Sequence, residues 1–502
     1  MEQFFDTDHL ILLIALLLIV GVLVAKFSAR LGVPALVLFI LAGMAAGSDG
    51  LGLIYFDNVQ LTQTVGMLAL IIIIFEGGLQ TKWTTVKPVA VPSIFLASIG
   101  VLITSLVVAV AAKFVLGITW FEGFLFGAIV SSTDAAAVFA VLKGQNLRER
   151  LKATLEFESG SNDPMAVLLT LTFVELLLLD KSYANFWLIG SFFWQMGIAS
   201  ILGFVMGKLA AMAINKINLD SSGLYPVFVL AFALLTYSLT SLVGASGLLA
   251  VYVSALVIGN SEIAFKHSIF GFNEGFAWIM QILMFMILGL LVFPTQLFVP
   301  NIMLNGLLLS AVLMFFARPV AVFISTIKMG FSLKEKFFLS WAGLKGAVPI
   351  VLATYPLTAG LENSHLFFNV VFFVVLTSAL IQGSSIMLFA EKLKLTIPKR
   401  VESPHSLELI SIGKANAEII EFQVCEANDI TGKALANITF PKDVLVTAII
   451  RSGQLITPTG ITKVEAGDIL YILMDKKSKK ELIELLNNLK ADFEDVICTE
   501  QM

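Results

Sequence analysis

Residues 158–164 read Glu158-Ser159-Gly160-Ser161-Asn162-Asp163-Pro164 and interrupt an otherwise apolar run from Leu155 to Leu179. A charged side chain at the centre of a bilayer costs roughly 2.5 to 3.5 kcal/mol, so a membrane span carries one mainly where it faces a partner, an ion or trapped water. Asp163 is therefore a functional candidate. Further charged residues lie in other apolar runs: Glu76, Asp134, Glu158, Arg318 and Lys345.

The composition around this stretch is that of a polytopic membrane protein. Of the 502 residues, 58% are hydrophobic and 14% are charged, which excludes an ordinary globular protein in water. A helix needs about 20 apolar residues to cross a bilayer. We therefore predict an all-α membrane domain over residues 1–394 with thirteen transmembrane helices. They begin near His9, Ala35, Leu61, Val89, Trp120, Leu155, Phe186, Tyr225, Ala245, Gly275, Asn301, Phe337 and Leu366.

Basic residues predict the orientation of these helices, because Lys and Arg stay on the cytoplasmic side. One set of alternate connections is rich in them, whereas the other set has only Lys113 and Lys181. This places the N-terminus outside and everything after Lys392 in the cytoplasm of a plasma-membrane protein. Residues 1–8 lack a positive region, so the first helix is expected to be a retained span. Cys425 and Cys498 fall on the cytoplasmic side, where thiols stay reduced.

The composition changes after the last predicted span. Residues 395–410 form a linker, and residues 411–490 alternate apolar and polar positions in a way typical of strands. Strands are expected at 418–425, 444–450 and 468–474, with a turn at 451–454. Residues 476–490 have helical apolar spacing. We predict a small cytoplasmic α+β domain followed by an acidic tail, 491–502.

Two of the predicted spans contain sequences that break helices. Residues 130–134 read Val-Ser-Ser-Thr-Asp, and residues 343–349, seven spans later, read Gly-Leu-Lys-Gly-Ala-Val-Pro. Interruptions at corresponding places in two halves indicate a transporter built from inverted repeats, with its site at the midplane. If the broken helices cross, Asp134 can neutralise the positive helix ends and Lys345 the negative ones. Both residues then have a purely architectural alternative role.

Helical geometry divides the polar residues of the sixth span between two faces. Ser159 and Asp163 are four residues apart and share one face, while Glu158 and Asn162 share its neighbour. The first face can offer a carboxylate and a hydroxyl to an ion. Glu158 needs a cation from another helix, with Arg318 and Lys345 as candidates. A buried acid with a basic partner is more often a structural ion pair than a transport group.

The polar residues in these spans suit a partly dehydrated monovalent cation, which prefers oxygen ligands. Asp163, Ser159, Thr133 and the carbonyls near Asp134 supply them. Burial favours a protonated carboxyl, whereas a bound cation favours the ionised form. Proton and cation are then expected to compete for one site, and exchange follows.

A second acid, Glu76, lies near the inner end of the third span. It either extends the path by which the ion enters or is an interfacial acid paired with Lys82. The sequence leaves these two readings equally open.

Five motifs occur in order and together resemble the monovalent cation/proton antiporter family, in the branch whose sixth helix carries Asn-Asp. The resemblance implies a homodimer, a dimer domain with a moving core domain, and an elevator-like shift. It assigns ion binding to Asp163, with Ser159, Thr133, Asp134 and Glu76 near the ion. Asn162 stands where the other branch has a second Asp, which implies electroneutral exchange. The motifs are Phe75-Glu76-Gly77-Gly78-Leu79, Ser132-Thr133-Asp134, Glu158-Ser159 with Asn162-Asp163, Ala317-Arg318-Pro319, and residues 341–347.

One residue departs from this pattern. The branch commonly has Arg at the position of Lys345, and the two side chains differ because only Arg offers a rigid planar fork. A lysine can also lose its proton in a dry site, which leaves the stoichiometry open.

The cytoplasmic part resembles the C-terminal lobe of the regulator-of-potassium-conductance module (RCK_C, or TrkA-C) at residues 430–433 and 464–470. That resemblance implies dimerisation and a regulatory nucleotide such as cyclic di-AMP, and it favours potassium over sodium. The glycine fingerprint of a Rossmann lobe is missing, so NAD binding is not expected. No catalytic cofactor and no nucleic-acid partner are expected either.

Two other classes of protein compete with an antiporter. A ligand-gated potassium channel would suit the cytoplasmic domain, but no Thr-Val-Gly-Tyr-Gly-like filter is present. An intramembrane aspartyl protease would use Asp134 and Asp163 as a dyad that shares a proton. Asn162 and the nearby hydroxyls suit ion ligation better than proteolysis.

Overall fold

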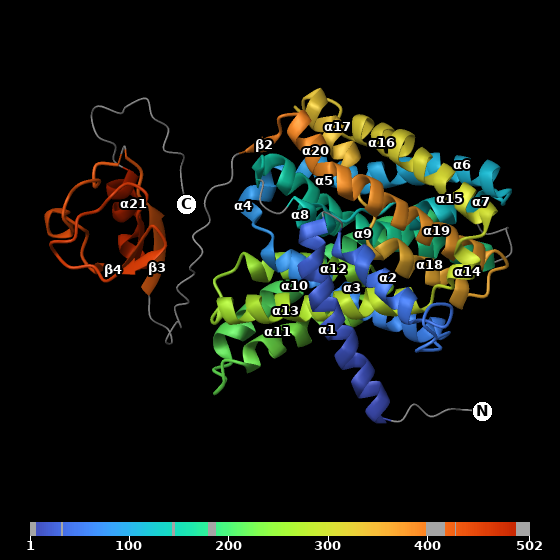
Figure 1. Ribbon diagram of the computed structural model, residues 1–502, viewed down its shortest axis with the longest axis horizontal. Helices are drawn as coiled ribbons and strands as arrows, with labels where there is room; N and C mark the ends of the chain where they lie inside the picture. The colour runs from blue at the N-terminus through green and yellow to red at the C-terminus, as the bar shows by residue number, and fades with distance from the viewer. Residues whose placement is uncertain are drawn as a thin grey trace. The chain divides into compact units, whose positions relative to one another are not determined.

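Apolar runs become helices in the computed structural model, which describes residues 7–31, 34–142, 146–178, 187–397, 417–426 and 428–487 (Figure 1). The chain divides into two compact units, Met1–Lys399 and Arg400–Met502. The first is helical and apolar, and the second is built on strands, so the predicted fold class is confirmed. Residues 1–6, Lys181, Cys498 and the predicted acidic tail lie outside the described residues.

Eight helical segments among the described residues are long and apolar enough to cross a membrane. Helices suit lipid because every backbone polar group is bonded inside the segment. The eight segments are Val59–Gln80, Trp83–Leu116, Glu149–Leu178, Gly190–Lys216, Leu224–Leu242, Lys266–Leu290, Pro300–Ser325 and Ser364–Lys392. Shorter apolar helices cover Ala15–Ser28, Ala35–Ala46, Trp120–Ile129, Gly247–Gly259 and Ala347–Thr358. The chain is thus a multi-pass membrane protein, and the count of thirteen spans stays a prediction.

Most of these segments are single continuous helices. They are α1 (Thr7–Leu31), α2 (Ala35–Ala46), α3 (Val59–Gln80), α9 (Glu149–Leu178), α10 (Trp187–Lys216), α11 (Leu224–Leu242), α12 (Gly247–Gly259) and α13 (Lys266–Leu290). Short helical turns connect some of them: α4 (Trp83–Val86), η1 (Lys87–Val89) and α14 (Pro294–Leu297). The predicted starts differ from the observed ones by several residues in places, because polar first turns such as that of α9 continue the helix beyond the apolar run.

Two kinds of irregularity recur in the same order along the chain. A π-helical turn lies inside α5 (Ala90–Phe95), η2 (Leu96–Gly100) and α6 (Val101–Leu116), and again inside α15 (Pro300–Val312), η4 (Leu313–Ala317) and α16 (Arg318–Ser325). A broken pair follows each time: α7 (Trp120–Ile129) with α8 (Ala135–Val141), and α17 (Leu333–Trp341) with α18 (Ala347–Thr358). A third π turn, η5 (Ala379–Gly383), joins α19 (Ser364–Ser378) to α20 (Ser384–Lys392). The repeated order is what two structural repeats predict.

The helices of the first unit pack in two groups. One group contains α1 to α3 and α10 to α13, and the other contains α5 to α9 and α15 to α20. In Figure 1, α6, α15, α16 and α17 lie along the upper side of this unit, and α10, α11 and α13 lie along the lower side. The groups meet where α3 packs on α18 and where α12 packs on α9. At the second contact Gly160 lies close to the ring of Tyr252, where a Cβ would clash.

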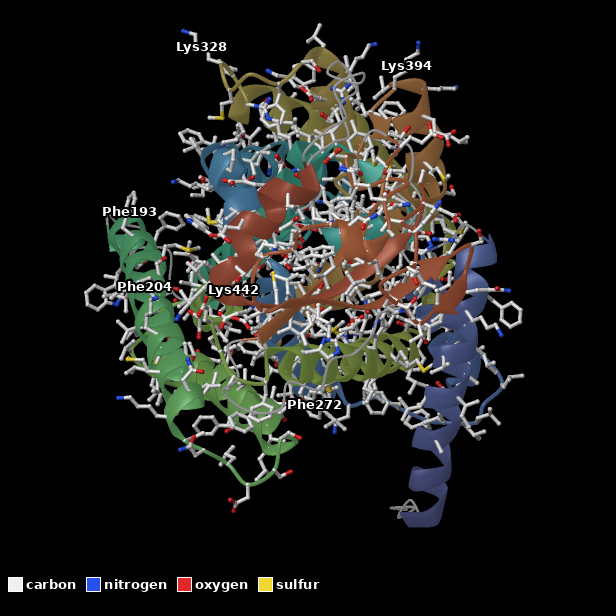
Figure 2. The ribbon with its side chains drawn as sticks, turned by 90° about the vertical axis from the view of Figure 1, so that its left-hand side faces the viewer. Phe193, Phe204, Phe272, Lys328, Lys394 and Lys442 are labelled. Carbon is white, nitrogen blue, oxygen red and sulfur yellow. The ribbon has the colours of Figure 1, made fainter. Side chains whose placement is uncertain are left out.

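The outer surface of this unit is apolar. Phe193 and Phe204 on α10 are 69% and 53% exposed, and both project away from the helix bundle (Figure 2). Phe272 on α13 is also exposed. Such surfaces suit contact with lipid, which removes apolar side chains from water.

A two-stranded ladder closes the first unit. Strand β1 (Asn146–Leu147) pairs antiparallel with β2 (Thr396–Ile397), and the Arg148 backbone N–H donates to the Leu395 carbonyl at 3.4 Å. The predicted linker therefore begins with a strand that belongs to the membrane unit, while residues 398–416 lie outside the described residues. The ladder connects the end of α20 directly to the start of α9.

The second unit contains a four-stranded antiparallel sheet in the order β3-β6-β4-β5. Leu482 and Leu486 of its helix are fully buried in one core with sheet residues Ile449 and Ile472. The predicted turn is a tight hairpin between β4 and β5, with Ser452 and Gly453 both at positive φ. The elements are β3 (Ala417–Gln423), η6 (Leu435–Asn437), β4 (Val444–Arg451), β5 (Gln454–Ile456), β6 (Ile469–Asp475), η7 (Lys476–Ser478) and α21 (Lys479–Asn487).

Candidate functional site

The two helix breaks cross each other inside the first unit. Residues 130–134 separate α7 from α8, and residues 342–346 separate α17 from α18. The Asp134 backbone N–H donates to the Leu344 carbonyl at 2.8 Å, which joins one break to the other. Gly346 lies so close to the Asp134 carboxylate that a Cβ would collide with Oδ2. Only glycine allows the two chains to approach this closely.

Asp134 and Lys345 lie at opposite kinds of helix end. The Ala137 N–H donates to Asp134 Oδ1 at 3.1 Å, so this carboxylate caps the positive end of α8. Lys345 Nζ donates to the carbonyls of Ser131 at 3.2 Å and Ser132 at 2.7 Å, beyond the negative end of α7. Each side chain therefore satisfies backbone groups that the break leaves without a helical partner.

Helix α9 holds the first break with two of its side chains. Ser159 Oγ donates to the Thr133 carbonyl at 2.9 Å and accepts the Ala135 N–H at 3.2 Å. Asn162 Nδ2 donates to Thr133 Oγ1 at 2.6 Å, and Asn162 Oδ1 accepts the Thr133 N–H at 3.4 Å. The structure thus brings Thr133, Ser159 and Asn162 together in one network. Thr133 uses its N–H, its carbonyl and its hydroxyl in it.

Asp163 differs from these neighbours because part of its carboxylate is left without a partner. Its side chain is 8% exposed, and among the described residues its Oδ1 has no hydrogen-bond partner. Asp134 and Lys345 are the charged groups that act on it electrostatically. Pro164 follows it inside α9 and has no N–H, so the carbonyl of Gly160 loses its helical donor. A buried ionised carboxylate is costly unless a proton or a cation neutralises it.

Glu158 pairs with Arg318 and not with Lys345. Glu158 Oε1 lies 2.6 Å from Arg318 Nη1, and both side chains are almost completely buried. Arg318 Nη2 also donates to the Leu339 carbonyl at 3.4 Å. A Cβ on Gly343 would lie 2.5 Å from Arg318 Nε, so this glycine makes room for the guanidinium. Of the two candidate partners, geometry selects the arginine on α16.

Glu76 lies on α3, in the other group of helices. Gln80 Nε2 donates to Glu76 Oε1, and Glu274 is a like charge that acts on this carboxylate. No ion pair between Glu76 and Lys82 is present in the described part of the chain. The described hydrogen bonds of Glu76 therefore do not link it to the network around Thr133.

Two polar residues that sequence reasoning missed support the second break. Ser378 and Gln382, on either side of the start of η5, are 0% and 1% exposed. Ser378 Oγ accepts the Lys345 N–H at 3.2 Å, and Gln382 Nε2 donates to the Trp341 carbonyl at 2.9 Å. Their spacing of four residues within an apolar span was the available signal.

Comparison with known proteins agrees with this geometry. Residues 13–392 match the family described as sodium/hydrogen exchanger, transmembrane, and residues 419–487 match the TrkA-C domain. The K(+)/H(+) antiporter NhaP2 of Shewanella sp. (strain ANA-3) is 40% identical over 478 residues, which cover 95% of this chain and 82% of that protein. The K(+)/H(+) antiporter NhaP of Alkalimonas amylolytica is 38% identical over 88% of this chain and 77% of its own length.

A solved structure shares the arrangement of the helices. The sodium proton antiporter MjNhaP1 from Methanocaldococcus jannaschii, at pH 8, superposes with a TM-score of 0.67 and 26% identity, covering 76% of this chain and 98% of the other. The chain belongs to the sodium/hydrogen exchanger family and carries a TrkA-C domain.

Proposed function

We propose that this protein is a secondary active antiporter that exchanges a monovalent cation for protons by alternating access, with ion and proton competing for Asp163. One observation carries the proposal. Asp163 is a buried carboxylate with an unpartnered oxygen, next to a helix break where the side chains of Ser159 and Asn162 are already bonded to Thr133. It is the place in this network where a cation or a proton supplies an interaction that the protein does not.

The oxygens around Asp163 suit an alkali cation. The Ser159 and Thr133 oxygens keep lone pairs beyond the hydrogen bonds that hold them, and the Gly160 carbonyl has lost its helical donor. Hard oxygen ligands of this kind bind hard cations. The site moves between the two sides of the membrane readily when Asp163 carries a proton or a cation, whereas the bare Asp163 carboxylate does not. Coupled exchange follows from this difference.

The charge moved in each cycle follows from the pair Asn162-Asp163. The side-chain amide of Asn162 is hydrogen-bonded to Thr133, and Asn162 adds no second titrating carboxyl group. One carboxylate then carries one cation or one proton, which gives electroneutral exchange. Potassium is favoured over sodium because relatives that are 40% and 38% identical to this chain are named potassium/proton antiporters. The relative of known structure is titled a sodium proton antiporter, so both ions belong in the assay.

We place the protein in the plasma membrane with its N-terminus outside and its TrkA-C domain in the cytoplasm. Lys328 and Lys394 belong to the basic set of connections and project from the same end of the membrane unit (Figure 2). The proposed assembly is a homodimer. Its site residues toward the ion are Asp163, Asp134, Thr133, Ser159, Asn162 and Glu76, and its structural charge pairing uses Glu158, Arg318 and Lys345.

The TrkA-C domain is the proposed regulator, with a small nucleotide such as cyclic di-AMP as its ligand. The chain leaves the membrane unit through β2, which is hydrogen-bonded to β1 immediately before the ion-site helix α9. Movement of the regulatory domain is therefore expected to act on the start of α9, the helix that carries Asp163. Deletion after Ile397 keeps this ladder, and it is expected to leave exchange intact but unregulated. Complete loss of exchange in a folded protein would give the domain a direct transport role.

The direct test is Asp163→Asn in proteoliposomes. Proton flux is recorded with an internal pH dye after separate potassium and sodium gradients are imposed. The substitution removes the only proposed carrier of both ions, so flux driven by either gradient should fall to the level of empty liposomes. Glu175→Gln is the matched control, because it neutralises an exposed carboxylate twelve residues further along the same helix.

The same assay shows the competition. Lower pH fills Asp163 with protons, so the half-saturating potassium concentration should rise as pH falls, by up to about tenfold per pH unit. Wild-type flux in Asp163→Asn, or half-saturation that is independent of pH, contradicts the proposal. Large electrical currents through purified protein would instead indicate a potassium channel.

A further inference from the structure

Ser378 and Gln382 form a buried polar pair in the last span, where α19 gives way to the π turn η5. Ser378 Oγ donates to Gln382 Oε1 at 2.6 Å, and both side chains are sealed from solvent. A π turn inserts one extra residue into a helix and is frequent at functional sites. Here it turns two polar side chains inward, toward the second helix break.

This pair spans the second break from one side to the other. Gln382 Nε2 donates to the carbonyl of Trp341, the last residue of α17, and Ser378 Oγ accepts the N–H of Lys345, near the start of α18. The directions of these hydrogen bonds agree, because the Gln382 amide donates its N–H to the Trp341 carbonyl while its oxygen accepts from the Ser378 hydroxyl. Turning the amide over would place two acceptors against each other. One orientation is therefore fixed.

The pair is linked to the ion site through the side chain of Lys345. Lys345 Nζ donates to the carbonyls of Ser131 and Ser132, directly before Thr133. Thr133 in turn is bonded to Ser159 and Asn162, the neighbours of Asp163 on α9. Any shift of the backbone at Lys345 therefore moves the carbonyls that precede Thr133.

We propose that Ser378 and Gln382 are positioning residues for cation binding, acting through Lys345 and without touching the ion. The inference rests on the proposed function and adds to it a determinant of cation affinity on a span that carries none of the ion-site residues. A cation site requires its oxygens to be held by surrounding hydrogen bonds, and loss of such outer partners typically costs about 10- to 100-fold in affinity. The effect is expected in the half-saturating potassium concentration, with the maximal rate nearly preserved.

Ser378→Ala leaves the Lys345 N–H and the Gln382 oxygen without partners. In full-length protein in proteoliposomes it should raise half-saturating potassium about tenfold or more, with the maximal proton flux within about twofold of wild type. Ser378→Thr keeps the hydroxyl and should restore the wild-type value. Ser384→Ala is the matched control, since Ser384 is an exposed serine of the same span whose Oγ bonds only to its own helix. It should change neither quantity.

Gln382→Glu separates the two ends of the pair, because the new side chain still accepts from Ser378 but has no amide to offer Trp341. It should also raise half-saturating potassium, and it carries the test if Ser378→Ala does not fold. The decisive experiment is a double-mutant cycle with Lys345→Met. If the pair acts through Lys345, Ser378→Ala should add no further change in half-saturation once the ammonium group is gone.

Several results overturn the inference. They are wild-type half-saturation in folded Ser378→Ala and Gln382→Glu, a fall in maximal rate at unchanged half-saturation, or additive effects in the cycle. Each of these leaves exchange by wild-type protein and its loss in Asp163→Asn untouched. Failure of the positioning role is therefore distinguishable from failure of the proposed function, which the Asp163→Asn comparison decides alone.

Discussion

The two helix breaks solve the same physical problem with different side chains. Both expose backbone groups at membrane depth, where each must find a partner. The break at residues 130–134 is held by Ser159 and Asn162 of α9, the helix that also carries Asp163. The break at residues 342–346 is held by Gln382, Ser378 and the Arg318–Glu158 pair.

This difference indicates that the first break belongs to the ion site and that the second break supports it. Around the first break, the groups that hold the backbone lie beside an unpartnered carboxylate, so a bound ion can act on them directly. The side chains that hold the second break are paired with one another, Gln382 with Ser378 and Glu158 with Arg318. We infer that the first break responds to the ion and that the second holds the first in place through the contacts of Lys345 and Leu344.

The largest expected effect comes from breaking the Glu158–Arg318 ion pair beside the second break. Glu158→Gln leaves the Arg318 guanidinium buried without its counter-charge, which should lower the free energy of unfolding by about 3 to 5 kcal/mol. Thermal unfolding of the detergent-solubilised protein, followed by intrinsic fluorescence, measures it. Glu156→Gln is the matched control because the Glu156–Lys152 pair is longer, at 3.8 Å, and partly exposed to solvent. Equal melting temperatures for the two variants would refute a structural role for the buried pair.

A smaller effect is expected where the two breaks touch. Gly346→Ala places a Cβ against the Asp134 carboxylate, and overpacking of this kind costs about 1 to 3 kcal/mol. Gly77→Ala is the control, since a Cβ at Gly77 meets nothing within 4 Å. The same unfolding assay should show a lower melting temperature for Gly346→Ala alone. If both variants match wild type, the crossing is looser than the structure shows.

Substitutions at the first break should change the affinity for the cation more than the free energy of unfolding. Asn162→Ala removes both hydrogen bonds that its side chain makes to Thr133, each worth about 1 kcal/mol. We expect half-saturating potassium to rise roughly tenfold or more, because about 1.4 of these roughly 2 kcal/mol already corresponds to a factor of ten. Proton flux against potassium concentration in proteoliposomes measures it. A lower melting temperature with unchanged half-saturation would assign Asn162 to the support instead.

The two helix breaks could be predicted from the sequence, whereas the contacts that hold them could not. Runs of hydroxyl residues, glycines and a proline mark residues 130–134 and 343–349 as interruptions, because these residue types weaken a helix. The strands and hairpin of the TrkA-C domain followed from alternation and turn residues in the same way. These signals are local, so they survive without knowledge of the fold.

The partners of buried groups could not be read from the sequence, because they depend on which helices meet. Arg318 and Lys345 were equally available to Glu158, and only the path of α16 past Gly343 decides between them. The sequence does not distinguish Gln382 and Ser378 from other polar residues, because only the π turn places their side chains against the second break. Asn162 marked a branch of the family in the sequence, whereas its bonds to Thr133 give it a physical task.

The smallest effect is expected from Lys345→Arg, which tests how much the crossing depends on the shape of this cation. Arginine keeps a positive charge and N–H donors for the Ser131 and Ser132 carbonyls, but its planar fork is bulkier than an ammonium group in a site that is 1% exposed. Because the charge and the donors are kept, half-saturating potassium should change by less than about tenfold, which corresponds to less than about 1.4 kcal/mol. A potential-sensitive dye in the same liposomes should record no transport-driven voltage in either protein, because one carboxylate carries one charge in each direction. A voltage in wild type that disappears in Lys345→Arg would show that Lys345 releases a proton during the cycle, and the second break would then be part of the chemistry as well as the support.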